Sequence, residues 1–173
     1  MFAGKTSHLI RLIKTYQNKN KSCLALNHTL DSRYSNDPYI LSHDNEKIQA
    51  KKISSLEEII LNKEYEGYDV VAIDEAQFFK DIVSGAEFFA NEGKIVLVSG
   101  LDGTYLRKPF GDFMNLIPLA ETVTKLHAKC VKCNMAASFT KRINSVENKD
   151  ILVGYQQLYM PLCRKCYFIY KDK

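Results

Sequence analysis

The stretch VVAIDEAQFF, residues 70–79, decides the fold class, because four apolar residues end abruptly in two acids, Asp74 and Glu75. A short apolar run rich in β-branched residues is typical of a strand buried in a parallel sheet. Successive strand residues point to opposite faces, so we expect the two acids to address different groups. A strand followed only by a solvated acidic turn is the alternative interpretation.

The segments around this strand alternate between helix and strand patterns. Ser55 and Glu58 form a capping pair before a short helix, and Gly93 is expected to end a longer one. The predicted helices cover residues 6–16, 56–61 and 79–91, and the predicted strands cover residues 22–26, 68–73, 94–99 and 121–127. Residues 27–52 are polar and are expected to be irregular. This alternation predicts an α/β fold with a parallel sheet.

Gly4-Lys5-Thr6 opens the first predicted helix. In a P-loop, backbone N–H groups at a helix N-terminus surround phosphates, the lysine reaches the outer phosphates, and the hydroxyl ligates magnesium. The tripeptide alone is a weak signal. An apolar strand ending in Asp74 is the Walker B layout, in which the acid holds magnesium. Together the two motifs predict a nucleotide site.

The P-loop pattern G-x-x-x-x-G-K-[ST] also requires a glycine five residues before Gly4, and the sequence begins only three residues before it. We therefore expect the chain to lack the strand that delivers the loop, together with the first glycine. We expect it to bind nucleotide weakly, because ordering a frayed terminus costs about 1–2 kcal/mol per residue.

Four of the five cysteines form two C-x-x-C pairs, Cys130/Cys133 and Cys163/Cys166. Two such pairs complete a tetrahedral zinc site, and four thiolates leave no open position for catalysis, which predicts structural zinc. Disulfides and a redox C-x-x-C are the alternatives. The N-terminus lacks the layout of a signal peptide, so we expect a cytoplasmic protein with reduced thiols. We place a domain boundary between residues 1–129 and 130–173, and expect Cys23 to be a small buried residue.

Composition excludes several classes of protein. The chain has 173 residues, of which 46% are hydrophobic and 25% are charged, as in ordinary soluble domains. No apolar run approaches the length of a membrane span. The net charge is +4, but the basic residues are dispersed, so we expect neither a membrane nor a nucleic acid as a direct partner.

Taken together, these motifs resemble one family. The stretches that carry the resemblance are MFAGKT at residues 1–6, DSRYS at 31–35, HD at 43–44, IDEAQFF at 73–79, LDGT at 101–104, RKPFG at 107–111 and the two cysteine pairs. The chain is similar to type II thymidine kinases, the zinc-containing cytosolic kind. The resemblance implies a RecA-like P-loop sheet and a C-terminal zinc-ribbon lobe with a loop that covers the substrate.

The resemblance also implies transfer of the γ-phosphate of ATP to the 5′-hydroxyl of thymidine, giving thymidine monophosphate. This reaction belongs to deoxynucleotide salvage, which supplies DNA synthesis. The cofactors would be Mg²⁺ with the ATP and a structural Zn²⁺. The enzyme would be a cytoplasmic homotetramer.

Roles for individual residues follow from the resemblance alone. Glu75 matches the catalytic base. The residues matching the ATP and magnesium site are Met1, Phe2, Ala3, Gly4, Lys5, Thr6, Asp31, Ser32, Arg33, Asp74, Glu75, Ala76 and Gln77. The residues matching the nucleoside site are Phe78, Leu101, Tyr105, Asp150, Ile151, Leu152, Val153, Gly154 and Tyr159. The family more often has Phe at position 105, and Gly where Tyr155 stands.

Two other functions are compatible with the motifs. The first is a P-loop ATPase whose zinc ribbon contacts DNA, since four basic residues flank the cysteines: Lys129, Lys132, Arg164 and Lys165. The second is an inactive remnant of a kinase that folds around its zinc but lacks the start of its P-loop.

Overall fold

The computed structural model describes residues 1–31, 38–41, 46–143 and 158–169. Ser32 and Arg33, together with the loop residues Asp150–Gly154, lie outside the described residues. Among the described residues, no helix is both long and apolar enough to cross a membrane.

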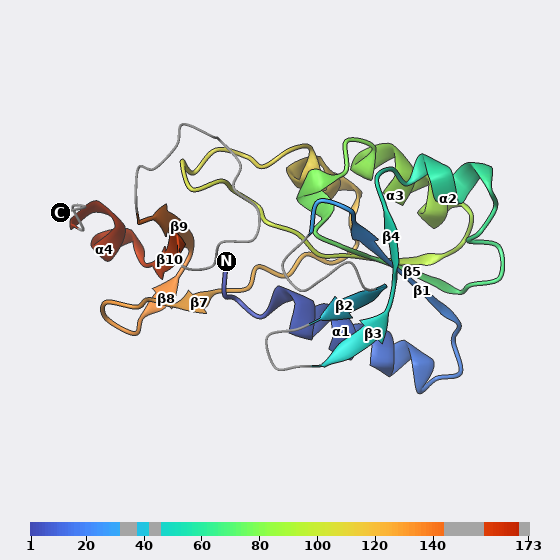
Figure 1. Cartoon of the computed structure of the whole chain (residues 1–173), viewed down its shortest axis with the longest axis horizontal. Helices are drawn as coiled ribbons and strands as arrows, with labels where there is room; N and C mark the ends of the chain where they lie inside the picture. The colour runs from blue at the N-terminus through green and yellow to red at the C-terminus, as the bar shows by residue number, and fades with distance from the viewer. Residues whose placement is uncertain (32–37, 42–45, 144–157, 170–173) are drawn as a thin grey trace.

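Four parallel strands form the main sheet, as the alternation of patterns predicts (Figure 1). Their spatial order is β4 (Lys51–Ile53), β1 (Cys23–His28), β5 (Val70–Asp74) and β6 (Ile95–Val98). Every residue of β5 is buried, because this strand has neighbours on both sides and helices over both faces. Asp74, the last residue of β5, and Glu75, which follows the strand, are therefore held in the interior of the fold.

Helices cover the two faces of the sheet (Figure 1). Helix α1 (Lys5–Gln17) packs on one face, and α2 (Glu57–Leu61) and α3 (Ile82–Asn91) pack on the other. The α1 face of the strands carries the small residues Ala25 and Ala72, whereas the other face carries Leu26 and Ile73. The pleat separates these residues, since strand side chains alternate between faces.

The remaining elements are short. Strands β2 (Tyr39–Leu41) and β3 (Lys47–Gln49) form an antiparallel pair, and two 3₁₀ helices are η1 (Ala76–Phe78) and η2 (Phe113–Leu119). The C-terminal part pairs β7 (Ala128–Lys129) with β8 (Ala136–Ala137) and β9 (Phe139–Arg142) with β10 (Tyr159–Leu162), and ends in α4 (Arg164–Ile169). We call this part, residues 128–143 and 158–169, the cysteine lobe.

Three predicted segments need correction. The described residues of the segment 27–52 are not all irregular, because β1 continues to His28, β2 and β3 lie within the segment and β4 begins at Lys51. The predicted strand at 121–127 is wrong, because residues 122–127 have no regular structure and pairing begins only at Ala128. Strand propensity is too weak to form a strand there without a neighbour to pair with. The third predicted helix begins at Ile82, after a 3₁₀ turn.

The helix ends follow local chemistry. Gly93 terminates α3 in the left-handed region, with φ of 76°, where glycine carries no steric cost. The Ser55 hydroxyl does accept a hydrogen bond from the Glu57 amide (3.2 Å), but Glu58 accepts from Ser54 and does not complete a capping box. The Asp81 carboxylate also accepts a hydrogen bond from the Glu57 backbone amide (3.0 Å), so the residue just before α3 helps to cap α2.

Candidate functional site

The two sequence motifs meet where α1 begins and β5 ends. The Thr6 hydroxyl donates a hydrogen bond to Oδ2 of Asp74 at 3.1 Å, across 68 residues of sequence. Asp74 is 1% exposed and lies opposite Asn27 in the parallel register of β1 and β5. A hydroxyl and a carboxylate in contact at a helix N-terminus are the pair of oxygens that a magnesium–nucleotide site requires.

The residues before Thr6 lead from this point toward the cysteine lobe (Figure 1). Gly4 precedes α1 in the left-handed region, with φ of 71°, and its carbonyl accepts the first helical hydrogen bond, from His8. The Met1 amino group donates to the Thr140 hydroxyl at 3.0 Å, and Ala3 packs against the core of the lobe. The segment predicted to surround phosphates therefore joins the sheet to the lobe.

Glu75 follows Asp74 in an unusual conformation. Its φ of 51° and ψ of 39° place a residue other than glycine in the left-handed region, which costs on the order of 1–3 kcal/mol and is common at active sites. The side chain is buried, and Oε2 accepts a hydrogen bond from the Gln77 amide at 2.6 Å. The strand ends at Asp74, so this left-handed turn, and not the alternation of the pleat, sets the direction of Glu75.

Gln77 ties this turn to the loop that follows β6. Its Oε1 accepts a hydrogen bond from the Leu101 amide at 2.8 Å. Gly111 approaches from the far end of the same loop, with φ of 57°, and a Cβ there would lie 2.7 Å from the Gln77 carbonyl oxygen. Sequence reasoning gave Gly111 no role, although the stretch RKPFG at 107–111 marked the segment.

Asp31 lies in the loop that follows β1. Its carboxylate is buried and accepts a hydrogen bond from the Asn27 amide at 3.0 Å. Since Asn27 is the register partner of Asp74, the loop that carries Asp31 begins at the same end of the sheet.

The aromatic residues predicted to contact a base form two groups. Phe78 lies edge-on to Phe110, with ring centroids 5.6 Å apart, and its ring centroid also lies 5.7 Å from that of His28. Tyr105 lies 6.4 Å from Tyr159, which comes from the cysteine lobe. His28 and Phe110 were missed by sequence reasoning, because a single aromatic residue carries no local signal of its partner.

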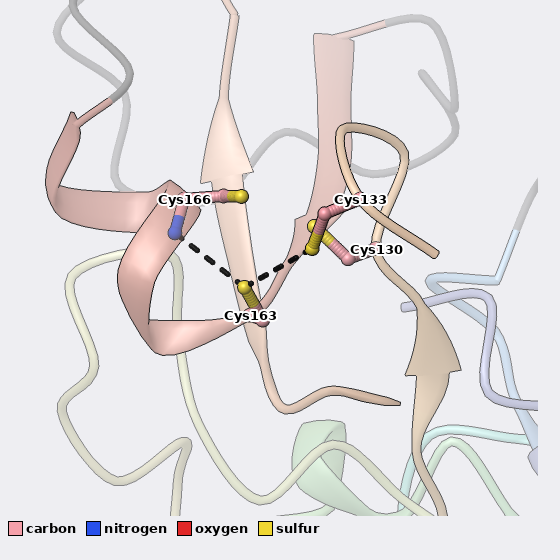
Figure 2. A group of neighbouring side chains, drawn as sticks. All are labelled: Cys130, Cys133, Cys163 and Cys166. Carbon is pink, nitrogen blue, oxygen red and sulfur yellow. Dashed lines mark hydrogen bonds between the residues drawn. The ribbon is translucent and has the colours of Figure 1, made fainter. Parts of the chain in front are cut away.

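The four paired cysteines converge on one point (Figure 2). Their sulfur atoms all lie within 4.8 Å of one another, and Cys133 and Cys163 have sulfurs 3.6 Å apart. A tetrahedral ion with bonds of about 2.3 Å would hold its sulfurs about 3.8 Å apart, so the cluster fits zinc. A disulfide would place two sulfur atoms about 2.05 Å apart, and all four of these cysteines are free. The sequence prediction of the ligand set is confirmed as a possible metal site.

The thiols of this cluster differ in proton affinity. Burial raises the pKa of Cys130, but hydrogen bonds from the backbone amides of Cys163, Lys132 and Cys133 outweigh it and lower the pKa to about 6. Hydrogen bonds with the sulfurs of Cys133 and Cys163 raise the pKa of Cys166 to about 12. Four thiols this close resist joint ionisation unless a cation is bound, which is the usual behaviour of a metal site.

The parallel sheet with helices on both faces defines an α/β protein, in which Gly-Lys-Thr begins a helix and its threonine contacts the acid of a central strand, as in P-loop proteins. The sequence profile of the thymidine kinase family matches residues 1–167. The chain belongs to the thymidine kinase family.

Individual relatives agree with this assignment. The chain is 46% identical to the thymidine kinase of Yaba monkey tumor virus over 168 residues, which cover 97% of this chain and 90% of that protein. It is 43% identical to thymidine kinase 1 of Dictyostelium discoideum over 96% of this chain and 74% of that protein. It is 42% identical to the thymidine kinase of vaccinia virus over 96% of this chain and 92% of that protein.

Proposed function

We propose that this protein transfers the γ-phosphate of ATP to the 5′-hydroxyl of thymidine and so produces thymidine monophosphate for DNA synthesis. The observation that carries the proposal is the 3.1 Å hydrogen bond between Thr6 and Asp74, which joins the two nucleotide motifs. Membership of the thymidine kinase family supports thymidine as the acceptor.

The ATP site is built on the N-terminus of α1. The backbone amides of the first turn and the Lys5 ammonium would hold the β- and γ-phosphates, because the helix dipole and orphan N–H groups both favour anions there. Thr6 and Asp74 would hold a magnesium ion, which offsets phosphate charge when bound. The rest of this site would be formed by Met1, Phe2, Ala3, Gly4, Asp31, Ser32, Arg33, Ala76 and Gln77.

Glu75 is the proposed catalytic base. As the thymidine 5′-oxygen bonds to the γ-phosphorus, the bond from phosphorus to the leaving oxygen of ADP breaks, and the hydroxyl proton passes to the Glu75 carboxylate. The Gln77 amide holds Oε2 of that carboxylate at 2.6 Å. A base fixed by a neighbour and shielded from water keeps one orientation toward the hydroxyl that it must reach.

The thymine base would lie among apolar side chains. Phe78, Leu101, Tyr105 and Tyr159 are the proposed walls, and the main chain of residues 150–154 is the proposed cover and hydrogen-bonding partner of the ring. Flat aromatic walls with a few polar contacts suit a neutral pyrimidine.

The cysteine lobe has a structural part in this proposal. Zn²⁺ bound by Cys130, Cys133, Cys163 and Cys166 would fix the lobe and, through it, the covering loop. We also propose a domain boundary near residue 129, where the paired cysteines begin. Assembly as a homotetramer and a cytoplasmic location are proposed from the family resemblance.

Labelled phosphate transfer tests the function. With γ-labelled ATP, magnesium and thymidine, we expect label in thymidine monophosphate, and we expect Thr6→Val to abolish most of it because that variant removes only the hydroxyl. ATP hydrolysis that is stimulated by single-stranded DNA, without transfer to thymidine, would contradict the proposal and favour a nucleic-acid motor.

A further inference from the structure

We propose that Tyr167, on helix α4 of the cysteine lobe, is a positioning residue that holds the Tyr105 wall of the nucleoside site in place. This inference rests on the proposed function, because it takes Tyr105 to be a wall of that site. Neither the motifs nor the family resemblance gives Tyr167 a role.

Tyr105 lies in a hairpin that the main sheet does not support. Residues 103 and 109 form an isolated bridge, the Thr104 amide donates to the Lys108 carbonyl at 2.9 Å, and the Arg107 amide donates to the Thr104 carbonyl at 2.9 Å. Residues 106–109 are exposed. A small turn held by its own hydrogen bonds needs outside contacts to keep one orientation.

Those contacts come from the cysteine lobe. The Tyr167 hydroxyl donates to the main-chain carbonyl of Tyr105 at 2.9 Å. The Arg142 guanidinium lies over the Tyr105 ring at 5.6 Å, and the Tyr159 ring lies 6.4 Å away. The carbonyl and the ring of Tyr105 are thus both contacted from the lobe, by residues of α4, β9 and β10.

Arg107 also stabilises this junction, the contact between the Tyr105 hairpin and the cysteine lobe, and does so from the hairpin side. It adopts φ of 61°, which is unfavourable for a residue with a side chain. In that conformation its guanidinium lies over Tyr167 at 5.1 Å and over Phe168 at 4.8 Å. Stacking on two aromatic rings is an interaction that suits the planar guanidinium better than an ammonium group. The strained turn therefore directs Arg107 onto the helix that holds Tyr105.

The position of Tyr167 couples the hairpin to the metal site. It directly follows Cys166 in α4, and its ring packs against the core of the lobe and lies 5.7 Å from Phe139. The ring contributes to packing of the lobe, whereas the hydroxyl reaches the hairpin. Removing only the hydroxyl therefore separates the positioning role from packing.

Tyr167→Phe tests the proposal, with Tyr16→Phe on α1 as the matched control. We expect the thymidine KM of Tyr167→Phe to rise about three- to tenfold, the size that one lost hydrogen bond predicts, with the ATP KM and kcat within about twofold. Zinc should stay at about one ion per chain. Amide exchange at residues 104–108 should become faster, and Tyr16→Phe should change none of these quantities.

Several results would overturn the proposal: an unchanged thymidine KM, an equal rise of both KM values, loss of zinc, or unchanged exchange at residues 104–108. Arg107→Gln provides a second variant, and its effect on thymidine KM should be less than additive with that of Tyr167→Phe, because both act on one junction. If the wild-type protein does not phosphorylate thymidine, the proposed function fails, and amide exchange alone then decides whether Tyr167 holds the hairpin.

Discussion

The turn at residues 75–77 and the cysteine lobe are held in place by different means. The turn follows β5, whose five residues are all buried between two neighbouring strands. The lobe is built on two-stranded pairs, and its cluster of buried residues consists of Ala128, Cys130, Ala137 and Leu162. Such a small apolar core rarely stabilises a fold without a metal or a disulfide. Burial therefore positions the acids, whereas the proposed zinc would position the lobe, and the two regions should lose their structure under different conditions.

The largest effect should follow from removing the metal. Structural zinc contributes an apparent 10–16 kcal/mol in small domains, so Cys130→Ser should lose most of its zinc and the order of the lobe. Thymidine phosphorylation should fall to near background. Amide exchange in β5 should stay slow, because its protection comes from the sheet.

Cys23→Ser is the matched control for this prediction. Cys23 is a free cysteine in β1, away from the cluster, so that variant should retain about one zinc per chain by elemental analysis. Two results would contradict the proposed difference between the two regions: full zinc content in Cys130→Ser, or fast amide exchange in β5 as well as in the lobe of that variant.

The next effect concerns catalysis at the turn. Glu75→Gln should lower kcat by about 10²–10⁴, because an amide cannot accept the hydroxyl proton. Thymidine affinity and zinc content should change little, since the substitution is isosteric and lies outside the lobe. Glu57→Gln, on the exposed first turn of α2, removes the same charge and should leave kcat unchanged. A Glu75→Gln enzyme with normal kcat would place the base elsewhere.

The smallest effect should be a pH dependence of the unfolding stability that comes from Asp69, beside the main sheet. The Ser22 backbone amide, the Lys21 ammonium and the Ser22 hydroxyl hold the pKa of Asp69 at about 2, well below its usual range. A carboxylate with a depressed folded pKa stabilises the fold above its unfolded value of about 3.9, and this contribution is lost as pH falls toward about 2.

Urea unfolding of wild type and Asp69→Asn measures this contribution. The stability difference between the two proteins should be constant above pH of about 5 and should shrink between about 4 and 2. Zinc content above that range should be the same in both, because Asp69 lies beside β1 and β5. A difference that does not depend on pH would show that the carboxylate charge is not stabilising.

Local patterns predicted the parts of the fold that depend on local chemistry. The run at residues 70–74 is a buried parallel strand, since an apolar β-branched run with acids after it has few other stable conformations. Gly93 ends α3 for an equally local reason. The predictions failed at 27–52, where three short strands form, and at 121–127, where none does. Pairing partners decided both cases, and a pairing partner is not encoded within the segment itself.

The candidate site also has features that local sequence predicts and features that depend on distant contacts. The identities of Thr6, Asp74, Glu75 and the paired cysteines could be predicted, because phosphate, magnesium and zinc each require particular ligand atoms at short spacing. The left-handed conformation of Glu75 could not be predicted, since it depends on a turn packed beneath the loop after β6.

The sequence by itself determined which chemical groups this protein carries and the α/β alternation that presents them. The tertiary structure brings Thr6 to Asp74 across 68 residues, as the two motifs predict, but only the tertiary structure decided that Tyr167 meets Tyr105 across 62 residues. The physical reason is that periodicity and ligand chemistry act over a few residues of chain. A contact between distant segments depends instead on the strand order, on the packing of both sheet faces and, in the lobe, on the meeting of two distant cysteine pairs at one point.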